Sequence, residues 1–202
     1  MVVRTIAVIG AGAVGREIAY AAALAGYKTI VEDVVSSRLD QAIAWINQAL
    51  NADVARCRVE GSIRDAALAN LWTASTIEDA VREADLIIET VAEEMEMKIE
   101  LFTIFDKFAK PGTIFASSAA SHSISEMAAV TFCAERCIGM RFVEADSDAK
   151  RLALVRGLET SDETVAICRE TGLRIGREVV VVRESDAGAG GCAELKSAGA
   201  QD

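Results

Sequence analysis

Short apolar segments alternate along the chain with longer segments whose apolar residues recur at helical spacing. The short segments predict strands at 5–10, 29–32, 71–75, 84–90, 113–116, 137–142 and 179–182, and the longer ones predict helices near 13–25, 36–53, 94–109 and 123–130. The strands are almost wholly apolar, so both faces of their sheet should be covered. The pattern therefore predicts a doubly wound α/β fold with a mostly parallel sheet and helices on both faces.

The same pattern predicts one domain over residues 1–184. Pro111 is the single proline, and no linker rich in proline or serine interrupts the alternation. After Arg183 the sequence becomes rich in glycine, alanine and serine and poor in large apolar residues. We expect residues 185–202 to form a flexible tail.

A glycine motif follows the first predicted strand and opens the first predicted helix. Gly10, Gly12 and Gly15 have the G-x-G-x-x-G spacing that suits a tight turn, a close approach of backbone to pyrophosphate and close packing of helix on sheet. The N-terminal dipole of that helix would face the phosphates. The motif predicts a Rossmann-type fold whose dinucleotide contacts include Gly10, Ala11, Gly12, Ala13, Val14 and Gly15.

Two carboxylates end the second predicted strand. Asp33 lies 18 residues beyond Gly15, where a ribose-binding carboxylate is expected; Glu32 is the competing candidate, and either can be an ordinary solvated acid. A carboxylate accepts hydrogen bonds from ribose hydroxyls and repels a 2′-phosphate. The cofactor predicted from Asp33 is NAD rather than NADP.

Composition narrows the classes of partner. The net charge of −10 disfavours nucleic acid and anionic lipid. No signal peptide is visible and no apolar segment approaches the length of a membrane span, so we expect a cytoplasmic protein. Five cysteines accompany a single histidine, which favours reduced, buried thiols over a metal site.

From about residue 4 to residue 184 the sequence resembles the NAD-binding domain of the 3-hydroxyacyl-CoA dehydrogenases. The matching segments are Ile9-Gly-Ala-Gly-Ala-Val-Gly, Ala25-Gly-Tyr, Ala84-Asp-Leu-Ile-Ile-Glu-Thr-Val-Ala-Glu, Lys98-Ile-Glu-Leu-Phe, Thr113-Ile-Phe-Ala-Ser, Ile138-Gly-Met-Arg-Phe and Thr160-Ser-Asp-Glu-Thr. The resemblance implies that Glu93 and Lys98 contact the nicotinamide end of the cofactor; alternatively they are ordinary charges at the start and surface of a helix.

Four positions depart from the family's catalytic pattern. Ala120 stands where the family has a serine that binds the substrate oxygen. Arg141 and Glu144 replace the histidine and asparagine of H-F-F-N-P, and Ala153 replaces the glutamate that orients the histidine. An arginine cannot act as a general base because its guanidinium stays charged. We therefore expect a degenerate active site.

Two further departures concern substrate binding. The family continues into a helical domain that builds the substrate cleft and a dimer interface, whereas this sequence reads Asp186-Ala-Gly-Ala-Gly-Gly-Cys. Ala49 and Arg56 lie near the positions of the family's serine and lysine contacts to coenzyme A, so coenzyme A binding has little support. A homo-oligomer that associates through residues 142–182 is a further expectation.

His122 and Arg141 are the two residues that invite another chemistry. His122 is the weak candidate for a replacement base, although a surface or helix-start histidine is the simpler interpretation. Arg141 and Glu144 can pair with each other, or the arginine can bind a carboxylate or phosphate.

Three hypotheses remain. The first is an NAD(H)-binding domain without dehydrogenase activity. The second is an active NAD-dependent oxidoreductase that uses His122 or Lys98 as proton donor, on 3-hydroxyacyl-CoA or another small carbonyl or hydroxy substrate. The third is an interaction module with an inherited nucleotide turn, which the intact glycines and Asp33 disfavour.

Overall fold

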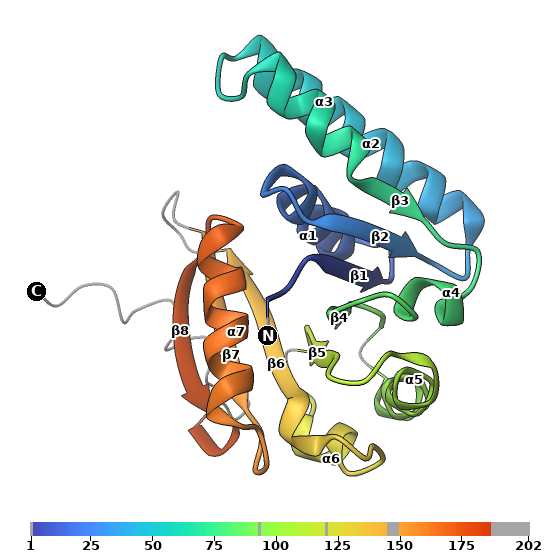
Figure 1. The fold of residues 1–202 in the computed structure, drawn as a ribbon, viewed down its shortest axis with the longest axis vertical. Coiled ribbons are helices and arrows are strands. Elements are labelled where there is room, and N and C mark those ends of the chain that lie inside the picture. The colour runs from blue at the N-terminus through green and yellow to red at the C-terminus, as the bar shows by residue number, and fades with distance from the viewer. Residues whose placement is uncertain (1, 93, 120, 145–149, 187–202) are drawn as a thin grey trace, which may run out of the picture. The chain divides into compact units, whose positions relative to one another are not determined.

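A computed structural model describes residues 2–92, 94–119, 121–144 and 150–186, apart from the side chains of Glu144 and Asp186. The chain forms two compact units, one of residues 1–91 and 108–113, the other of residues 92–107 and 114–202. Eight strands, mostly parallel, alternate with helices in an α/β fold of the Rossmann type (Figure 1). The fold class predicted from the pattern is confirmed.

The elements follow in this order: β1 (Thr5–Ile9), α1 (Ala13–Leu24), β2 (Lys28–Glu32), α2 (Ser36–Ala55), α3 (Gly61–Ala69), β3 (Leu71–Thr73), α4 (Ile77–Val81), β4 (Leu86–Glu89), α5 (Met95–Phe108), β5 (Ile114–Ser117), α6 (Ile124–Ala128), η1 (Ala134–Arg136), β6 (Cys137–Glu144), β7 (Lys150–Arg156), α7 (Asp162–Arg174), β8 (Glu178–Arg183) and η2 (Glu184–Asp186).

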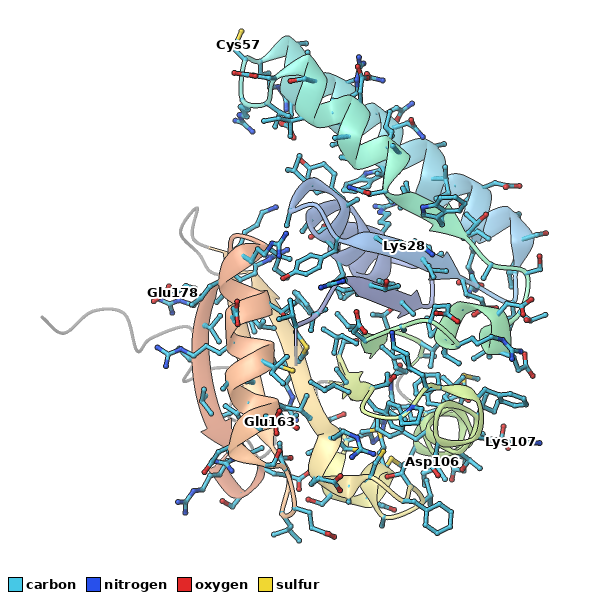
Figure 2. All side chains as sticks on the ribbon, in the orientation of Figure 1. Lys28, Cys57, Asp106, Lys107, Glu163 and Glu178 are labelled. Atoms are coloured by element: carbon cyan, nitrogen blue, oxygen red, sulfur yellow. The ribbon has the colours of Figure 1, made fainter. Side chains whose placement is uncertain are left out.

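The first unit is a parallel sheet in the order β3-β2-β1-β4. Residues 6–9 of β1 and all of β4 are buried, as expected for strands covered on both faces. Helices α2 and α3 lie side by side and pack with α1 (Figure 1), while α4 packs on β1 and β2. Cys57, labelled in Figure 2, lies between α2 and α3 and is exposed.

Asp85 joins the start of β1 to the start of β4 in this unit. Its carboxylate accepts hydrogen bonds from the backbone nitrogens of Arg4 at 2.7 Å and Thr5 at 2.9 Å, and it pairs with Lys110 at 2.7 Å. Burial acts to raise the pKa of Asp85, but the bonds from Lys110, Thr5 and Arg4 hold that pKa below its ordinary value. The carboxylate is therefore ionised and anchors the amino end of β1.

The second unit contains four strands in the order β5-β6-β7-β8. Strands β5 and β6 are parallel, β6 and β7 antiparallel, and β7 and β8 parallel. Phe102 and Phe105 of α5 pack their rings on Phe115 of β5, with centroids 6.1 and 5.8 Å away. Helix α7 packs on β6, β7 and β8.

Hydrophobic periodicity did not predict four of the helices and strands that the structure describes: α3, α4, β7 and α7. Helix α7 lacks a wide apolar face, but its ends carry clear signals. Ser161 caps its first turn by accepting a hydrogen bond from the backbone nitrogen of Thr164 at 3.1 Å, Asp162 and Glu163 follow, and Arg174 lies in the last turn. Of the predicted tail, residues 185–202, Ser185 and Asp186 belong to the 3-10 turn Glu184–Asp186, and residues 187–202 lie outside the described part.

Candidate functional site

The glycine turn connects β1 to α1 in the first unit. Gly10 has a φ of +104°, which side chains disfavour, and a Cβ on Gly15 would lie 1.9 Å from the carbonyl oxygen of Gly10. Thr90, just after β4, donates a hydrogen bond from its Oγ1 to that same oxygen at 2.8 Å. Gly10 and Gly15 are therefore required by the protein's own packing.

Gly12 differs from its two neighbours in the motif. It has an ordinary φ of −66°, and a Cβ built on it would meet no protein atom within 4 Å. Folding of the described residues thus gives no reason for a glycine here. The open space fits the close approach of a pyrophosphate, which is the reason that the motif predicts.

The start of α1 is prepared for an anion. Gly12 is the N-cap residue of α1, so no side chain caps this helix, and the first turn carries no acidic residue. Gly12, Ala13 and Val14 are exposed, whereas Ala11 and Gly15 are buried. The first N–H groups of a helix have no partner within the helix and attract phosphate oxygens.

Asp33 lies beside the glycine turn. Its Oδ2 accepts a hydrogen bond from the backbone nitrogen of Ala11 at 2.8 Å, and its Oδ1 accepts one from Val35 at 2.9 Å. These bonds fix the carboxylate at the carboxyl end of β2. A carboxylate can accept about four hydrogen bonds, so this geometry leaves acceptor capacity for ribose hydroxyls.

Glu32 has a different environment from Asp33. Its side chain is buried at 2% exposure, while Asp33 is half-buried. Burial, then repulsion by Asp33 and Glu78, raises the pKa of Glu32 to about 7. This burial favours Asp33 over Glu32 as the carboxylate that meets the ribose.

The two predicted nicotinamide contacts have separate outcomes. Glu93 lies outside the described residues. Lys98 is fully buried in α5, with 0% exposure, so it is not a helix-surface charge. Its role toward the cofactor remains a prediction.

Sequence reasoning gave no role to Thr90 or Glu89. Thr90 supports the glycine turn through the bond described above, and the fully buried Glu89 accepts a hydrogen bond on its Oε1 from the backbone nitrogen of Val91 at 2.6 Å. Their signal in the sequence was their place directly at the carboxyl end of an apolar strand, where open α/β sheets present their ligand-binding groups.

Arg141 and Ala153 are brought together in the second unit. They are register partners on the antiparallel strands β6 and β7, and both are buried, at 6% and 1% exposure. The Nε of Arg141 donates a hydrogen bond to the carbonyl oxygen of Ala119 at 2.8 Å. Ala120 and the side chain of Glu144 lie outside the described part, so the predicted pair of Arg141 and Glu144 remains a prediction.

Arg141 also lines a cavity of about 790 Å³ within the second unit. Its lining residues are mostly polar: Ser121, His122, Ser123, Ser125, Arg141, Arg156, Gly157, Leu158, Thr160, Arg183, Glu184 and Ser185. His122 therefore shares this cavity with Arg141. Nowhere in the described ranges do three or more His, Cys, Asp or Glu side chains gather as metal ligands.

The fold and the glycine turn define the chain as a dinucleotide-binding domain of the Rossmann type. The chain belongs to the 3-hydroxyacyl-CoA dehydrogenase family, because the family's NAD-binding domain matches residues 5–185. NAD is accordingly the cofactor of this domain.

Relatives and solved structures agree with this assignment. The chain is 35% identical over 180 residues to a 3-hydroxybutyryl-CoA dehydrogenase of Bradyrhizobium diazoefficiens, covering 89% of this chain and 61% of the relative. A probable 3-hydroxybutyryl-CoA dehydrogenase of Bacillus subtilis is 32% identical, with coverage of 91% and 64%. The crystal structure of the Escherichia coli 3-hydroxybutyryl-CoA dehydrogenase superposes with a TM-score of 0.85 at 32% identity, over 91% of this chain and 39% of that one. The chain thus spans less than two thirds of each.

Proposed function

We propose that the chain binds NAD(H) through its glycine turn and Asp33 and that it does not oxidise 3-hydroxyacyl-CoA by the family's acid–base chemistry. The observation that carries the first half is the open space at Gly12, beside a helix start without a cap or an acidic residue. The cofactor supplies a hydride acceptor when bound.

Different residues of the turn would bind different parts of the cofactor. The N–H groups of Ala13, Val14 and Gly15 open α1 and would bind the pyrophosphate, with Gly12 leaving room for it. Asp33 would accept the ribose hydroxyls and repel a 2′-phosphate, which favours NAD(H) over NADP(H). Thr90 and the close packing of Gly15 on Gly10 keep the turn in place.

Arg141 and Ala153 support the second half of the proposal. The resemblance assigns these two positions to the general base and the glutamate that orients it, and the two are opposite each other on β6 and β7. A guanidinium cannot accept the substrate proton, and Ala153 offers no carboxylate to hold a charged imidazole. The replacements therefore occur together at one cross-strand pair.

The test is a titration of the full chain with NADH and with NADPH, followed by calorimetry. Gly12→Val should weaken NADH binding by roughly a hundredfold while leaving the midpoint of thermal unfolding within a few degrees, because its side chain meets only the ligand. Asp33→Asn should weaken NADH binding by about tenfold and narrow the preference over NADPH. Glu170→Gln, an exposed change on α7, is the control and should alter neither.

A second assay addresses activity. Oxidation of NADH is followed after addition of acetoacetyl-CoA, and we expect no turnover above the rate without protein. Oxidation of NADH by the wild type that depends on acetoacetyl-CoA and is lost in Arg141→Gln would contradict the proposed lack of activity. Absence of NADH binding would contradict the first half and favour the interaction module.

An active oxidoreductase with a different proton donor is the second candidate function. The observation that favours it is the common cavity of His122 and Arg141. His122→Gln should then abolish turnover of small ketones and hydroxy acids without changing NADH affinity. Equal residual rates in wild type and variant would exclude His122 as donor.

Location and assembly complete the proposal. Within the described ranges, none of the helices combines the length and apolar character that crossing a membrane requires. Cys57, Cys133, Cys137 and Cys168 are free thiols, which supports a reducing, cytoplasmic setting. The apolar residues of β7 are buried, so a homo-oligomer through 142–182 would have to use Leu158, Leu173 and Val181, the exposed large apolar residues of that range.

A further inference from the structure

The cavity in the second unit concentrates positive charge in a strongly acidic chain. Three arginines, Arg141, Arg156 and Arg183, line it together with one carboxylate, that of Glu184. The chain as a whole carries a net charge of −10. The sign of the local charge is therefore opposite to that of the protein.

Two of these arginines are neighbours in the sheet. Arg156 of β7 and Arg183 of β8 are register partners on parallel strands. Like charges at adjacent positions repel each other unless an anion lies near them. Arg156 is partly compensated, because it pairs with Asp162 at 2.7 Å and donates a hydrogen bond to the carbonyl oxygen of Thr160 at 2.9 Å.

Glu184 is held by α6 on another side of the cavity. Its carboxylate accepts a hydrogen bond from the hydroxyl of Ser125 and one from the backbone nitrogen of Ser125 at 3.3 Å. The same hydroxyl accepts a hydrogen bond from the backbone nitrogen of Leu158 at 2.8 Å. Ser125 thus ties both η2, through Glu184, and the loop after β7, through Leu158, to α6.

The loop that forms one wall is fixed by further bonds. The Oγ1 of Thr160 donates a hydrogen bond to the carbonyl oxygen of Cys137 at 2.7 Å. The same Oγ1 accepts a hydrogen bond from the backbone nitrogen of Gly157 at 2.9 Å. Arg141 is oriented by its bond to Ala119 and is 6% exposed. A guanidinium group held in place, as that of Arg141 is, loses little side-chain entropy when it binds a ligand.

We propose that this cavity binds a small molecule through an oxyanion group, a carboxylate or a phosphate, which the guanidinium groups of Arg141 and Arg183 recognise. A planar guanidinium binds either group with paired N–H donors. The serine hydroxyls that line the cavity suit further oxygen atoms of such a ligand. The site lies wholly in the second unit, so this proposal does not depend on NAD binding.

His122 offers a built-in probe, because it is the single histidine of the chain and lines the cavity. The protein is labelled with ¹³C-histidine, and the imidazole resonances are followed at constant pH and constant ionic strength, with chloride as the replaced anion. Sodium malonate, sodium phosphate and uncharged malonamide are titrated separately, without nucleotide. NADH affinity of the same sample is measured independently.

We expect malonate or phosphate to shift the imidazole resonances in a saturable way and malonamide to leave them unchanged. The anion with the lower Kd identifies the oxyanion. Arg183→Gln, an exposed change, should weaken that binding by about tenfold, and Arg141→Gln should weaken it at least as much. Arg169→Gln, an exposed arginine of α7 outside the cavity, should bind like the wild type.

Three outcomes would overturn the proposal: no saturable shift with either anion, an equal shift with malonamide, or unchanged affinity in the folded Arg183→Gln variant. Because Arg141→Gln removes a buried group, its unfolding midpoint is measured as well. If that variant is unfolded, Arg183→Gln alone decides the result.

Discussion

The buried carboxyl of Glu32 gives a sharp prediction on stability. Its pKa is raised from an ordinary 4.5 to about 7, first by burial and then by repulsion from Asp33 and Glu78. Between these two pH values the unfolded chain releases the proton of Glu32 and the folded chain keeps it. The free energy of unfolding therefore falls as the pH rises through this range.

The magnitude follows from the size of the pKa shift. The difference of 7 − 4.5 is about 2.5 units, and each unit corresponds to about 1.36 kcal/mol, so Glu32 costs the folded state about 3 kcal/mol at pH 8 relative to pH 4. Below 4.5 the group is protonated in both states, and its stabilising effect is fully present. Above about 7 it is ionised in both states, and the loss is complete.

The assay is urea unfolding of the wild type and Glu32→Gln at several pH values from 4 to 9. Glutamine mimics the protonated acid and does not titrate, so the wild type should lose about 3 kcal/mol relative to the variant as the pH rises. Glu78→Gln removes one repelling charge and should lower the pKa of Glu32 in the folded state, so the loss of stability should be complete at a lower pH. Glu170→Gln should follow the wild type. A free-energy difference between wild type and Glu32→Gln that stays constant with pH, or a wild type that gains stability relative to the variant as the pH rises, would refute the reasoning.

Three further predictions concern other parts of the chain. Gly15→Ala should lower the free energy of unfolding by about 3 kcal/mol or more in chemical denaturation, because its Cβ would lie 1.9 Å from the carbonyl oxygen of Gly10; unchanged stability would contradict this packing. Asp85→Asn should lower the free energy of unfolding by about 2 kcal/mol near neutral pH, because it removes the ion pair with Lys110 and weakens two hydrogen bonds from backbone nitrogens. This difference from the wild type should vanish as acid protonates the carboxylate of Asp85, and thermal unfolding from pH 7 down to pH 2 measures it. Cys57→Ser should remove one rapidly reacting thiol in a DTNB assay of the folded protein, whereas Cys168→Ser should leave the rapid phase unchanged, because burial raises the pKa of Cys168 to about 12.

The strands of the first unit were readable from the sequence because burial on both faces makes them continuous apolar segments. Residues 6–9 and 86–88 are such segments, and the glycine motif marked the turn between β1 and α1 without any tertiary information. The turn depends on local geometry: the φ of +104° at Gly10 and the close contact of Gly15 are set within a few residues. Such local constraints require particular residue types, here glycine, so they can be recognised from the sequence.

Elements stabilised by distant contacts were harder to predict. Strand β7 carries a charged start, and its antiparallel register with β6 pairs residues that lie 6 to 16 positions apart in the sequence. Hydrophobic periodicity missed helix α7, although its capping serine and end charges were present, because the residues that it buries are small or polar: Thr164, Cys168, Thr171 and Gly172. In both cases the tertiary partner overrides a weak local pattern.

The sequence by itself determined the family and the cofactor turn, and it showed an arginine at position 141. Only the tertiary structure placed Ala153 opposite Arg141, buried Glu32 while leaving Asp33 beside the turn, and gathered Arg141, Arg156 and Arg183 around one cavity. The reason is that a turn is encoded by neighbouring residues, whereas charge clusters and burial depend on strand register and on segments far apart in the chain.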